Sequence, residues 1–346
     1  MIGKIIMNVR LSRRCYLHTL YSDCCHVNRP FQRDRYGVFH VGRSTLAPDQ
    51  KNLYHTNLTC AAGEGSSVSL ESAKLGVIGF GQMGGALVRG FINSGIIDPS
   101  DVGASVKSPE RKQSLLDMGV EHVFGDATHG GAEEIAKFSD IVLVGVKPQV
   151  IKPVLQSLSP FLEPRHLVVS IAAGIKLNEL ESHLGKGVRV IRVMPNTPAL
   201  AQQGASAYAL GSYAGDKDAE VVHTLLSKVG LAIRVQEKMM DGVTGVSGSG
   251  PAYVYMMIEA MADGGVAAGL PRETALALAA QTVKGAAEMV LHGDEDTLTH
   301  PGVLKDRVAS PAGTTIAAIA ELENAGVRNA FIRAVLASAS RSEELG

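Results

Sequence analysis

The stretch Leu75–Arg89, LGVIGFGQMGGALVR, decides the fold of this chain. Its first four residues, Leu75 to Ile78, predict a short buried strand, and apolar positions at Met83 and Leu87 then continue at helical spacing. Three glycines between strand and helix suit a dinucleotide turn, because they allow a tight bend, close approach of a pyrophosphate and close packing of the helix, whose positive N-terminus would hold the phosphates. We therefore expect dinucleotide contacts from Gly79, Phe80, Gly81, Gln82, Met83 and Gly84.

The composition is that of an ordinary globular protein. The chain has 346 residues, enough for two domains, with 45% hydrophobic and 19% charged residues. A formal net charge of -1 gives no reason to expect nucleic acid or an anionic membrane surface as a partner. No window approaches the ~20 apolar residues of a membrane helix. We expect neither nucleic acid nor membrane as a partner.

All four cysteines precede the glycine turn, at Cys15, Cys24, Cys25 and Cys60. The chain after residue 60 contains none. A disulfide framework, a thiolate zinc site and a cysteine nucleophile are therefore excluded for that part. We expect no metal site.

The first 72 residues differ from the rest. Residues 1–60 hold nine Lys or Arg against three acidic residues, a net charge of +6, and this basic, hydroxyl-containing leader resembles an organellar transit peptide for a mitochondrion or plastid. The alternative is a disordered or mispredicted stretch without an address, in which case the protein would be cytoplasmic. Residues 63–72, rich in Gly and Ser, predict a flexible link into the fold.

From Lys74 onward, short Val/Ile runs alternate with helical stretches, which predicts an α/β fold with a doubly wound, Rossmann-type parallel sheet. We expect strands at residues 75–78, 102–106, 120–124, 141–146, 167–172 and 188–193, with two further strands at 205–210 and 232–235. Helices are expected at residues 109–118, 149–158 and 216–228.

The strand signal ends near residue 237, and the remaining residues predict helices rich in alanine and methionine. The stretch Tyr253 to Ala262 is apolar nearly all round, which implies burial either in a domain core or against another subunit. Pro271 to Leu291 repeats apolar residues at helical spacing. We expect a leader at 1–72, a dinucleotide-binding domain at 73–236 and an all-α substrate and dimerisation domain at 237–346.

Ligands of such sheets bind beyond the carboxyl ends of the strands. Lys147 in that position would lie beside the cofactor, although it could also be an exposed loop lysine. Asn196, between two prolines, could bind the nicotinamide or its ribose, or merely form a turn. The loop residues expected to line the cofactor are Val146, Lys147, Pro148, Ala173 and Asn196.

The end of the second strand discriminates between cofactors. An NAD site typically has Asp or Glu there to bind the ribose hydroxyls, and this chain has none. It has Lys107, Ser108 and Arg111, which suit a 2′-phosphate, so NADPH is favoured and NADH stays possible. The alternative is a solvated basic helix start.

The stretch Leu304 to Glu323, LKDRVASPAGTTIAAIAELE, contains a second candidate site. Ser310 and Pro311 end one helix, and Ala312, Gly313 and Thr314 lead into another. Free N–H groups at that helix start could bind a carboxylate, with hydroxyls beside them. Taken alone, such a stretch is most often a helix cap.

The motifs together resemble the pyrroline-5-carboxylate reductase family. They are GFGQMG, VKP, MPNTP, VSGSGPAY, ADGGVAAGLPR, HPGVLKDRVASPAGTTI and RSEEL, and they run from about Lys74 to Leu345. The resemblance implies NAD(P)H-dependent reduction of Δ1-pyrroline-5-carboxylate to L-proline, the last step of proline biosynthesis, by a homodimer or higher homo-oligomer. It leaves the leader without an interpretation.

The resemblance also assigns roles around the second site. We expect Ser310, Ala312, Gly313 and Thr314 to bind the substrate carboxylate, and Thr315 to meet the imine nitrogen as the catalytic residue. The family usually has glycine where this chain has Ala312, which would strain the backbone if φ is positive there.

Two alternatives differ in class. A β-hydroxyacid dehydrogenase would need a general acid, usually lysine, and the corresponding stretch Gly248 to Gly265 contains none. A non-catalytic dinucleotide-binding regulator is disfavoured by intact Lys147, Asn196 and Thr315.

Overall fold

The computed structural model describes residues 70, 72–291 and 298–346. These residues belong to one compact unit, Cys60–Gly346. The predicted leader, its cysteines and its targeting role lie outside the described residues, except at positions 70 and 72.

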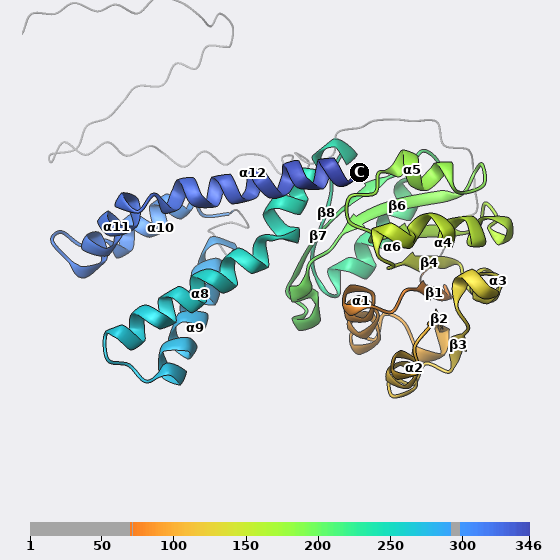
Figure 1. Cartoon of the computed structure of the whole chain (residues 1–346), viewed down its shortest axis with the longest axis horizontal. Coiled ribbons are helices and arrows are strands. Elements are labelled where there is room, and N and C mark those ends of the chain that lie inside the picture. The colour runs from red at the N-terminus through yellow and green to blue at the C-terminus, as the bar shows by residue number, and fades with distance from the viewer. Residues whose placement is uncertain (1–69, 71, 292–297) are drawn as a thin grey trace, which may run out of the picture. The chain divides into compact units, whose positions relative to one another are not determined.

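Eight strands form one sheet in the order β3-β2-β1-β4-β5-β6-β7-β8 (Figure 1). The chain moves outward from β1 in one direction to β3 and then returns to the other side of β1 at β4, so the topological switch point lies between β1 and β4. The strands are β1 Leu75–Ile78, β2 Val102–Ser105, β3 His122–Phe124, β4 Ile141–Val144, β5 Leu167–Ser170, β6 Arg189–Met194, β7 Gly204–Leu210 and β8 Gly230–Arg234.

The sequence predicted all eight strands, and four of them, β2, β4, β5 and β8, end one or two residues earlier than expected. Six strands run parallel from β3 to β6, as predicted, whereas β7 runs antiparallel to β6 and β8 runs parallel to β7. The reversal follows from a short connection: a 3-10 turn at Thr197–Ala201 ends at Gln202, whose φ of 56° turns the chain back. A parallel crossover needs a longer connection.

Helices cover both faces of the sheet. Buried apolar residues of α1, α2 and α6 pack on one face of the sheet, and those of α3, α4 and α5 pack on the other face. This two-sided burial explains why β1, β2, β4 and β5 are buried at every position. The helices are α1 Gln82–Asn93, α2 Pro109–Leu116, α3 Gly131–Phe138, α4 Ile151–Leu158, α5 Leu177–Ser182 and α6 Asp216–Ser227.

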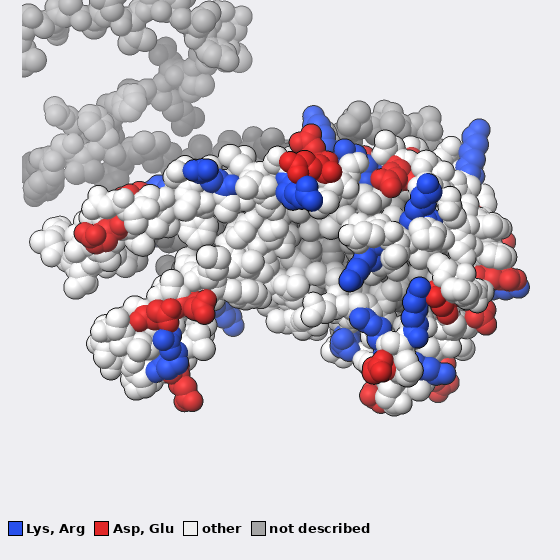
Figure 2. Space-filling view, in the orientation of Figure 1, with Lys and Arg blue, Asp and Glu red and all other residues white. Residues whose placement is uncertain are grey.

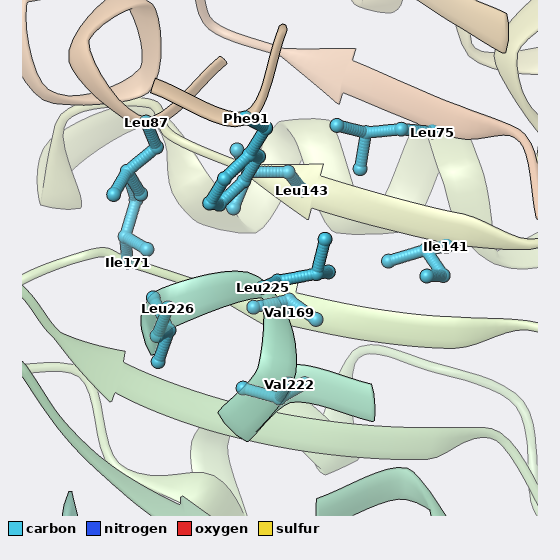
Figure 3. Close-up of a pocket in the computed structure, with 10 residues that line it drawn as sticks. All are labelled: Leu75, Leu87, Phe91, Ile141, Leu143, Val169, Ile171, Val222, Leu225 and Leu226. Carbon is cyan, nitrogen blue, oxygen red and sulfur yellow. The ribbon is translucent and has the colours of Figure 1, made fainter. Parts of the chain in front are cut away.

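A cavity of about 20 Å³ lies between α1, α6 and the sheet. Figure 3 shows Leu87 and Phe91 above it and Leu225 and Leu226 below, with strand side chains between them. Every lining residue is apolar, and the space holds one water molecule at most. We interpret it as a packing void of the core and not as a ligand site.

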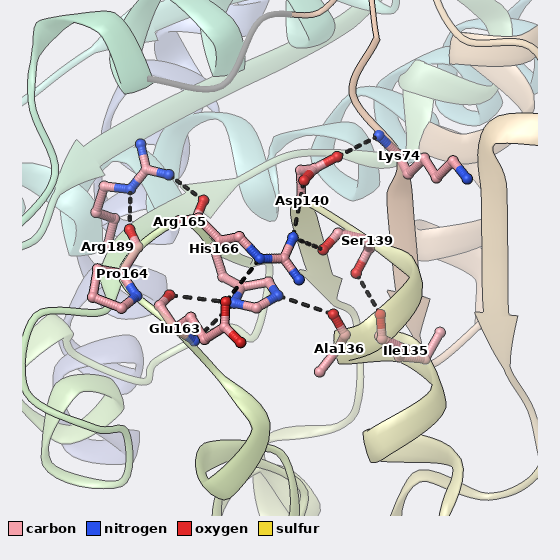
Figure 4. A network of polar contacts seen from close by, with 10 residues as sticks. All are labelled: Lys74, Ile135, Ala136, Ser139, Asp140, Glu163, Pro164, Arg165, His166 and Arg189. Atoms are coloured by element: carbon pink, nitrogen blue, oxygen red, sulfur yellow. Dashed lines mark hydrogen bonds and ion pairs between the residues drawn. The ribbon is translucent and has the colours of Figure 1, made fainter. Parts of the chain in front are cut away.

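Polar contacts fix the amino ends of the strands, at the edge opposite the expected site (Figure 4). Asp140, just before β4, accepts hydrogen bonds from the Lys74 amide at 3.1 Å and from Arg165 Nη1 at 3.1 Å. The fully buried His166 accepts from the Glu163 amide at Nδ1 and donates from Nε2 to the Ala136 carbonyl at 2.9 Å. The amino edge is therefore tightly held.

The described elements after β8 are helical. They are α7 Met240–Val243, a π-helical turn at Thr244–Gly248, α8 Gly250–Ala267, α9 Arg272–Leu291, α10 Pro301–Val308, α11 Thr314–Asn324 and α12 Val327–Leu345. Helices α8 and α9 form a pair whose small core consists of Ala262, Ala275 and Ala279. An ion pair of 2.5 Å between Arg272 and Asp263 joins the two helices near their connection.

Most large apolar side chains of these helices are exposed. In the stretch 253–262 only Ala262 is buried, and Met256 is 70% exposed, so the described part of this chain does not cover the stretch. Leu336 of α12 is 63% exposed. On the face shown in Figure 2, much of the surface over α8 and α12 carries no charged side chain. The described residues therefore give no support for burial in a core of this chain, and burial against another subunit stays a prediction.

Candidate active site

The glycine turn after β1 has the geometry that the sequence predicted. Gly79 has a φ of 94°, and a Cβ atom there would lie 2.7 Å from the Gly145 backbone. A Cβ atom at Gly84 would lie 2.5 Å from the Gly79 carbonyl oxygen, so a side chain would push α1 away from the turn. Both glycines are needed for the strand and helix to pack this closely.

The start of α1 is open to an anion. Its N-cap, Gly81, makes no side-chain cap hydrogen bond, so the first amides of the helix have no side-chain acceptor there. A Cβ atom at Gly81 would have only one neighbour within 4 Å, Arg111 Nη1 at 3.8 Å. The residues present therefore fit a dinucleotide pyrophosphate.

The ring of Phe80 is not available to a cofactor, because the side chain is only 4% exposed and belongs to the core, so any contact predicted there would involve its backbone. The Arg89 guanidinium lies 5.5 Å from the centre of this ring. Arg89 Nη1 also donates to Ser114 Oγ of α2 at 3.2 Å. Arg89, which the sequence did not single out, thus links the glycine turn and α1 to the helix that carries Arg111.

The segment after β2 presents two cations and a helix cap. Ser108 is the N-cap of α2, and its hydroxyl accepts from the Arg111 amide at 3.3 Å. Lys107 Nζ lies 2.9 Å from Asp126 Oδ2. Burial opposes ionisation of Asp126, but hydrogen bonds from Lys107, the Thr128 amide and His129 outweigh it and lower the pKa from 3.8 to about 2. Asp126 follows β3, so sequence order did not place it beside Lys107.

The loops after β4 and β5 lie at the same edge of the sheet. Lys147 is exposed, and Pro148 begins a 3-10 turn, while Val146 packs against the core. Ala173 is exposed just after β5 and precedes Gly174, whose φ is 80°. These positions suit contacts with a cofactor at the switch point, and those contacts stay a prediction.

Asn196 follows β6 and is 6% exposed. Its amide nitrogen donates to the Ser247 carbonyl at 3.1 Å, and its amide oxygen accepts from the Ala205 amide at 2.8 Å. The side chain therefore has a structural role between the sheet and the π-helical turn. The predicted contact of Asn196 with nicotinamide or ribose would have to be made in addition to these two hydrogen bonds.

The predicted substrate loop turns sharply before α11. Ala312 has a φ of 57°, so this non-glycine residue adopts the left-handed conformation. The Gly313 amide donates to the Ser310 carbonyl at 3.1 Å, and a Cβ atom at Gly313 would collide with Ser310 Oγ. Gly313 is the N-cap of α11 and makes no side-chain cap hydrogen bond. The first amides of α11, with the hydroxyls of Ser310 and Thr315 nearby in sequence, therefore suit a small carboxylate.

The predicted site has two halves, the carboxylate loop at residues 310–315 and the cofactor loops at the edge of the sheet. In the part of the chain that the structure describes, these halves are not joined by polar contacts. Among the described residues, no hydrogen bond or ion pair joins residues 310–315 to the glycine turn or to the loops after β2, β4, β5 and β6. Ser310, Pro311, Ala312 and Thr314 are exposed, and Thr315 is half-buried.

The described residues offer neither a metal-binding cluster nor a membrane-spanning helix. No group of three or more His, Cys, Asp or Glu side chains is placed there to hold a metal ion. No helix in the described part of the chain is both long and apolar enough to cross a membrane.

Family models match both the sheet part and the helical part of the chain. Residues 237–345 match the family model "Pyrroline-5-carboxylate reductase dimerisation", and residues 74–174 match "NADP oxidoreductase coenzyme F420-dependent". The pyrroline-5-carboxylate reductase of Arabidopsis thaliana is 47% identical over 80% of this chain and 97% of its own, and that of Glycine max is 46% identical over 80% and 98%.

A solved structure gives the same result. The Plasmodium falciparum pyrroline carboxylate reductase with NADP bound is 33% identical, with a TM-score of 0.71 over 80% of this chain and 100% of its own. With relatives at this identity covered almost in full, the chain belongs to the pyrroline-5-carboxylate reductase family.

Proposed function

We propose that this chain reduces Δ1-pyrroline-5-carboxylate to L-proline, with NADPH as the preferred cofactor and NADH as a possible one. The observation that carries the proposal is the uncapped start of α11 directly after the left-handed turn at Ala312. That arrangement offers backbone N–H groups to a small carboxylate, as the substrate requires. Family membership supports the same reaction.

The chain supplies two binding functions and one proton path. The glycine turn, the α1 N-terminus and Arg111 would hold the dinucleotide, with Lys147 and Ala173 beside it. The bound NADPH supplies a hydride to the imine carbon. Ser310, Ala312, Gly313 and Thr314 would hold the carboxylate and so fix the ring against that hydride.

Thr315 would meet the imine nitrogen through its hydroxyl. The C=N double bond becomes a C–N single bond, and the nitrogen needs one proton for the product amine. A threonine hydroxyl has no useful acidity of its own, so it passes a proton from water or orients an imine that is already protonated.

We further propose that the active unit is a homodimer or a higher homo-oligomer in which a second subunit covers the exposed helices. The domain boundary would then lie near residue 236, with the sheet in 73–236 and the subunit contacts in 237–346. The exposed apolar side chains of α8 to α12 support this, because one chain leaves them in water. The same assembly would bring residues 310–315 to a cofactor site that they do not contact in their own chain.

For the leader, we propose delivery to a mitochondrion or plastid. Its net charge of +6 and scarcity of acids support this. Residues 1–72 fused to a fluorescent protein should enter an organelle and lose their N-terminus there. Uniform cytosolic fluorescence would argue for a leader without an address.

The function is tested by incubating purified protein with Δ1-pyrroline-5-carboxylate and NADPH. We expect NADPH oxidation with stoichiometric proline, and little proline when Thr315→Ala replaces the wild type. A wild-type protein that binds NADPH but forms no proline would refute the proposal.

A further inference from the structure

Asp126 and Lys107 form an ion pair at the edge of the sheet where a dinucleotide ribose would lie. Their atoms Oδ2 and Nζ are 2.9 Å apart. Asp126 is fixed by its own turn, because Oδ1 accepts from the Thr128 amide at 3.1 Å and Oδ2 lies 3.1 Å from His129 Nδ1. The Asp126 side chain is 20% exposed and that of Lys107 is 72% exposed. The lysine is therefore the partner that can move.

Arg111, the other cation of this region, lies toward the glycine turn and not toward Asp126. Arg111 Nη1 is the one protein atom within 4 Å of the Cβ position at Gly81, so the guanidinium lies beside the glycine turn. Ser108, which caps the same helix, keeps its hydroxyl at the start of α2. Arg111 thus lies beside the glycine turn, while Lys107 is held toward the end of β3.

We propose that Asp126 limits the preference of this enzyme for NADPH, because it withdraws Lys107 from the 2′-phosphate position and leaves that group to Arg111 and Ser108. The inference rests on the proposed dinucleotide-dependent function. The ligand class is a nicotinamide dinucleotide with or without a 2′-phosphate.

The physical reason is electrostatic. A 2′-phosphate gains from each cation that reaches it and loses from a fixed carboxylate nearby, whereas the ribose hydroxyl of NADH is neutral and responds weakly to both. Hydrogen bonds from Lys107, Thr128 and His129 lower the pKa of Asp126 to about 2, despite its burial, so its negative charge persists at physiological pH. The ion pair therefore moderates NADPH binding and leaves NADH binding nearly unchanged.

The test is a double-mutant cycle on cofactor binding. Dissociation constants for NADPH and NADH are measured by calorimetry, without the second substrate, for the wild type, Asp126→Asn, Lys107→Ala and the double variant. Asparagine keeps an acceptor for the Thr128 amide. We expect Asp126→Asn to tighten NADPH by about threefold to fivefold, the range for one exposed ion pair, and to change NADH by less than about twofold. In the Lys107→Ala background the gain should fall to the small effect of removing one nearby negative charge, and in both backgrounds it should shrink at high salt.

A matched control variant separates the specific effect of Asp126→Asn on NADPH affinity from the general effect of removing one negative charge. Asp117→Asn on the same part of the molecule removes one negative charge from an exposed carboxylate that bonds Gln113. It should tighten NADPH less than Asp126→Asn does. Asp126→Ser, which also keeps an acceptor, should change NADPH in the same direction as Asp126→Asn.

Three results would overturn the inference. The first is unchanged NADPH binding in Asp126→Asn. The second is the full gain in NADPH affinity from Asp126→Asn in the Lys107→Ala background. The third is weaker NADH binding in Asp126→Asn, which would show that Asp126 binds the ribose hydroxyls itself. A wild-type protein that binds neither dinucleotide would refute the proposed function as well. These outcomes are distinguishable because binding is measured without turnover.

Discussion

The side-chain amide of Asn196 donates to the carbonyl oxygen of Ser247, across 3.1 Å. Asn196 ends the sheet at β6, and Ser247 lies in the π-helical turn that leads into α8. A Cβ atom at Gly248 would collide with the Met194 side chain, so the turn also packs against the end of β6. One buried amide therefore fixes the start of the helical part relative to the strand edge that carries the cofactor loops.

Replacing this amide should cost stability. Asn196→Ala removes a donor from the Ser247 carbonyl and an acceptor from the Ala205 amide, and we expect a loss of about 1–3 kcal/mol in the free energy of unfolding. Urea denaturation at fixed protein concentration measures it. Asn178→Ala, at an exposed position of α5, serves as the control and should change stability by less than about 0.5 kcal/mol. Unchanged stability with weakened NADPH binding would instead make Asn196 a cofactor ligand.

Ala312 should be a site where glycine stabilises. Its φ of 57° costs an alanine about 1–2 kcal/mol, which glycine avoids, while the greater freedom of glycine in the unfolded chain offsets part of this gain. We expect Ala312→Gly to raise the free energy of unfolding by about 0.5–1 kcal/mol. Ala309→Gly is the matched control, because its φ of -89° is ordinary and the same change should destabilise there. Equal losses at both positions would show that Ala312 is unstrained.

Arg111 should carry the preference for NADPH. Arg111→Ala removes the guanidinium beside the glycine turn, and we expect NADPH affinity to fall about tenfold, since a charge-assisted hydrogen bond contributes about 1.5 kcal/mol or more. NADH affinity should stay within about twofold. Lys112→Ala, one residue further along α2, controls for loss of a positive charge. A tenfold preference of the wild type for NADH would contradict this assignment.

The glycine turn and the central strands could be predicted from the sequence, because local residue patterns determine them. Gly79 fixes the turn through its positive φ and Gly84 through its close packing on the Gly79 carbonyl, and the central strands β1 and β4 are continuous apolar runs, so these elements were recognisable. Strand ends were less so, because Val106, Val146 and Ala172 are apolar yet belong to loops.

Contacts between distant residues escaped the sequence analysis. The pair Lys107–Asp126, the Asn196–Ser247 bond and the buried Arg189–Asp218 ion pair each join polar residues from different elements. The spacing of such residues in the sequence does not predict that they are in contact until the order of the strands in the sheet is known. The antiparallel course of β7 escaped for the same reason, because a strand pattern carries no direction.

The exposed apolar helices predict an obligate oligomer. Met256→Lys places a charge where 70% of the methionine is exposed in one chain and where the partner would cover it. We expect smaller, inactive particles or insoluble protein by sedimentation velocity. Leu116→Lys, on the exposed side of α2, should leave the assembly intact. A folded and active wild-type monomer would contradict the prediction.

Thr315 should matter for the chemical step more than for substrate capture. Its hydroxyl would meet a nitrogen whose charge changes during hydride transfer, so Thr315→Ala should lower kcat by ~10- to 1000-fold while NADPH affinity is kept. Thr315→Ser should retain most activity. Thr314→Ala, in the carboxylate clamp, should mainly raise KM. If Thr315→Ala raises only KM, then Thr315 belongs to the clamp.

The separation of residues 310–315 from the glycine turn of the same chain has a genetic consequence. If each site takes its carboxylate loop from one subunit and its cofactor turn from another, two inactive alleles can restore activity together. A mixed dimer of a Gly79→Val chain and a Thr315→Ala chain holds one site with both defects and one with neither. Two alleles damaged in the same half would never complement, so crosses between mutants would sort the active-site residues into those of the cofactor half and those of the carboxylate half.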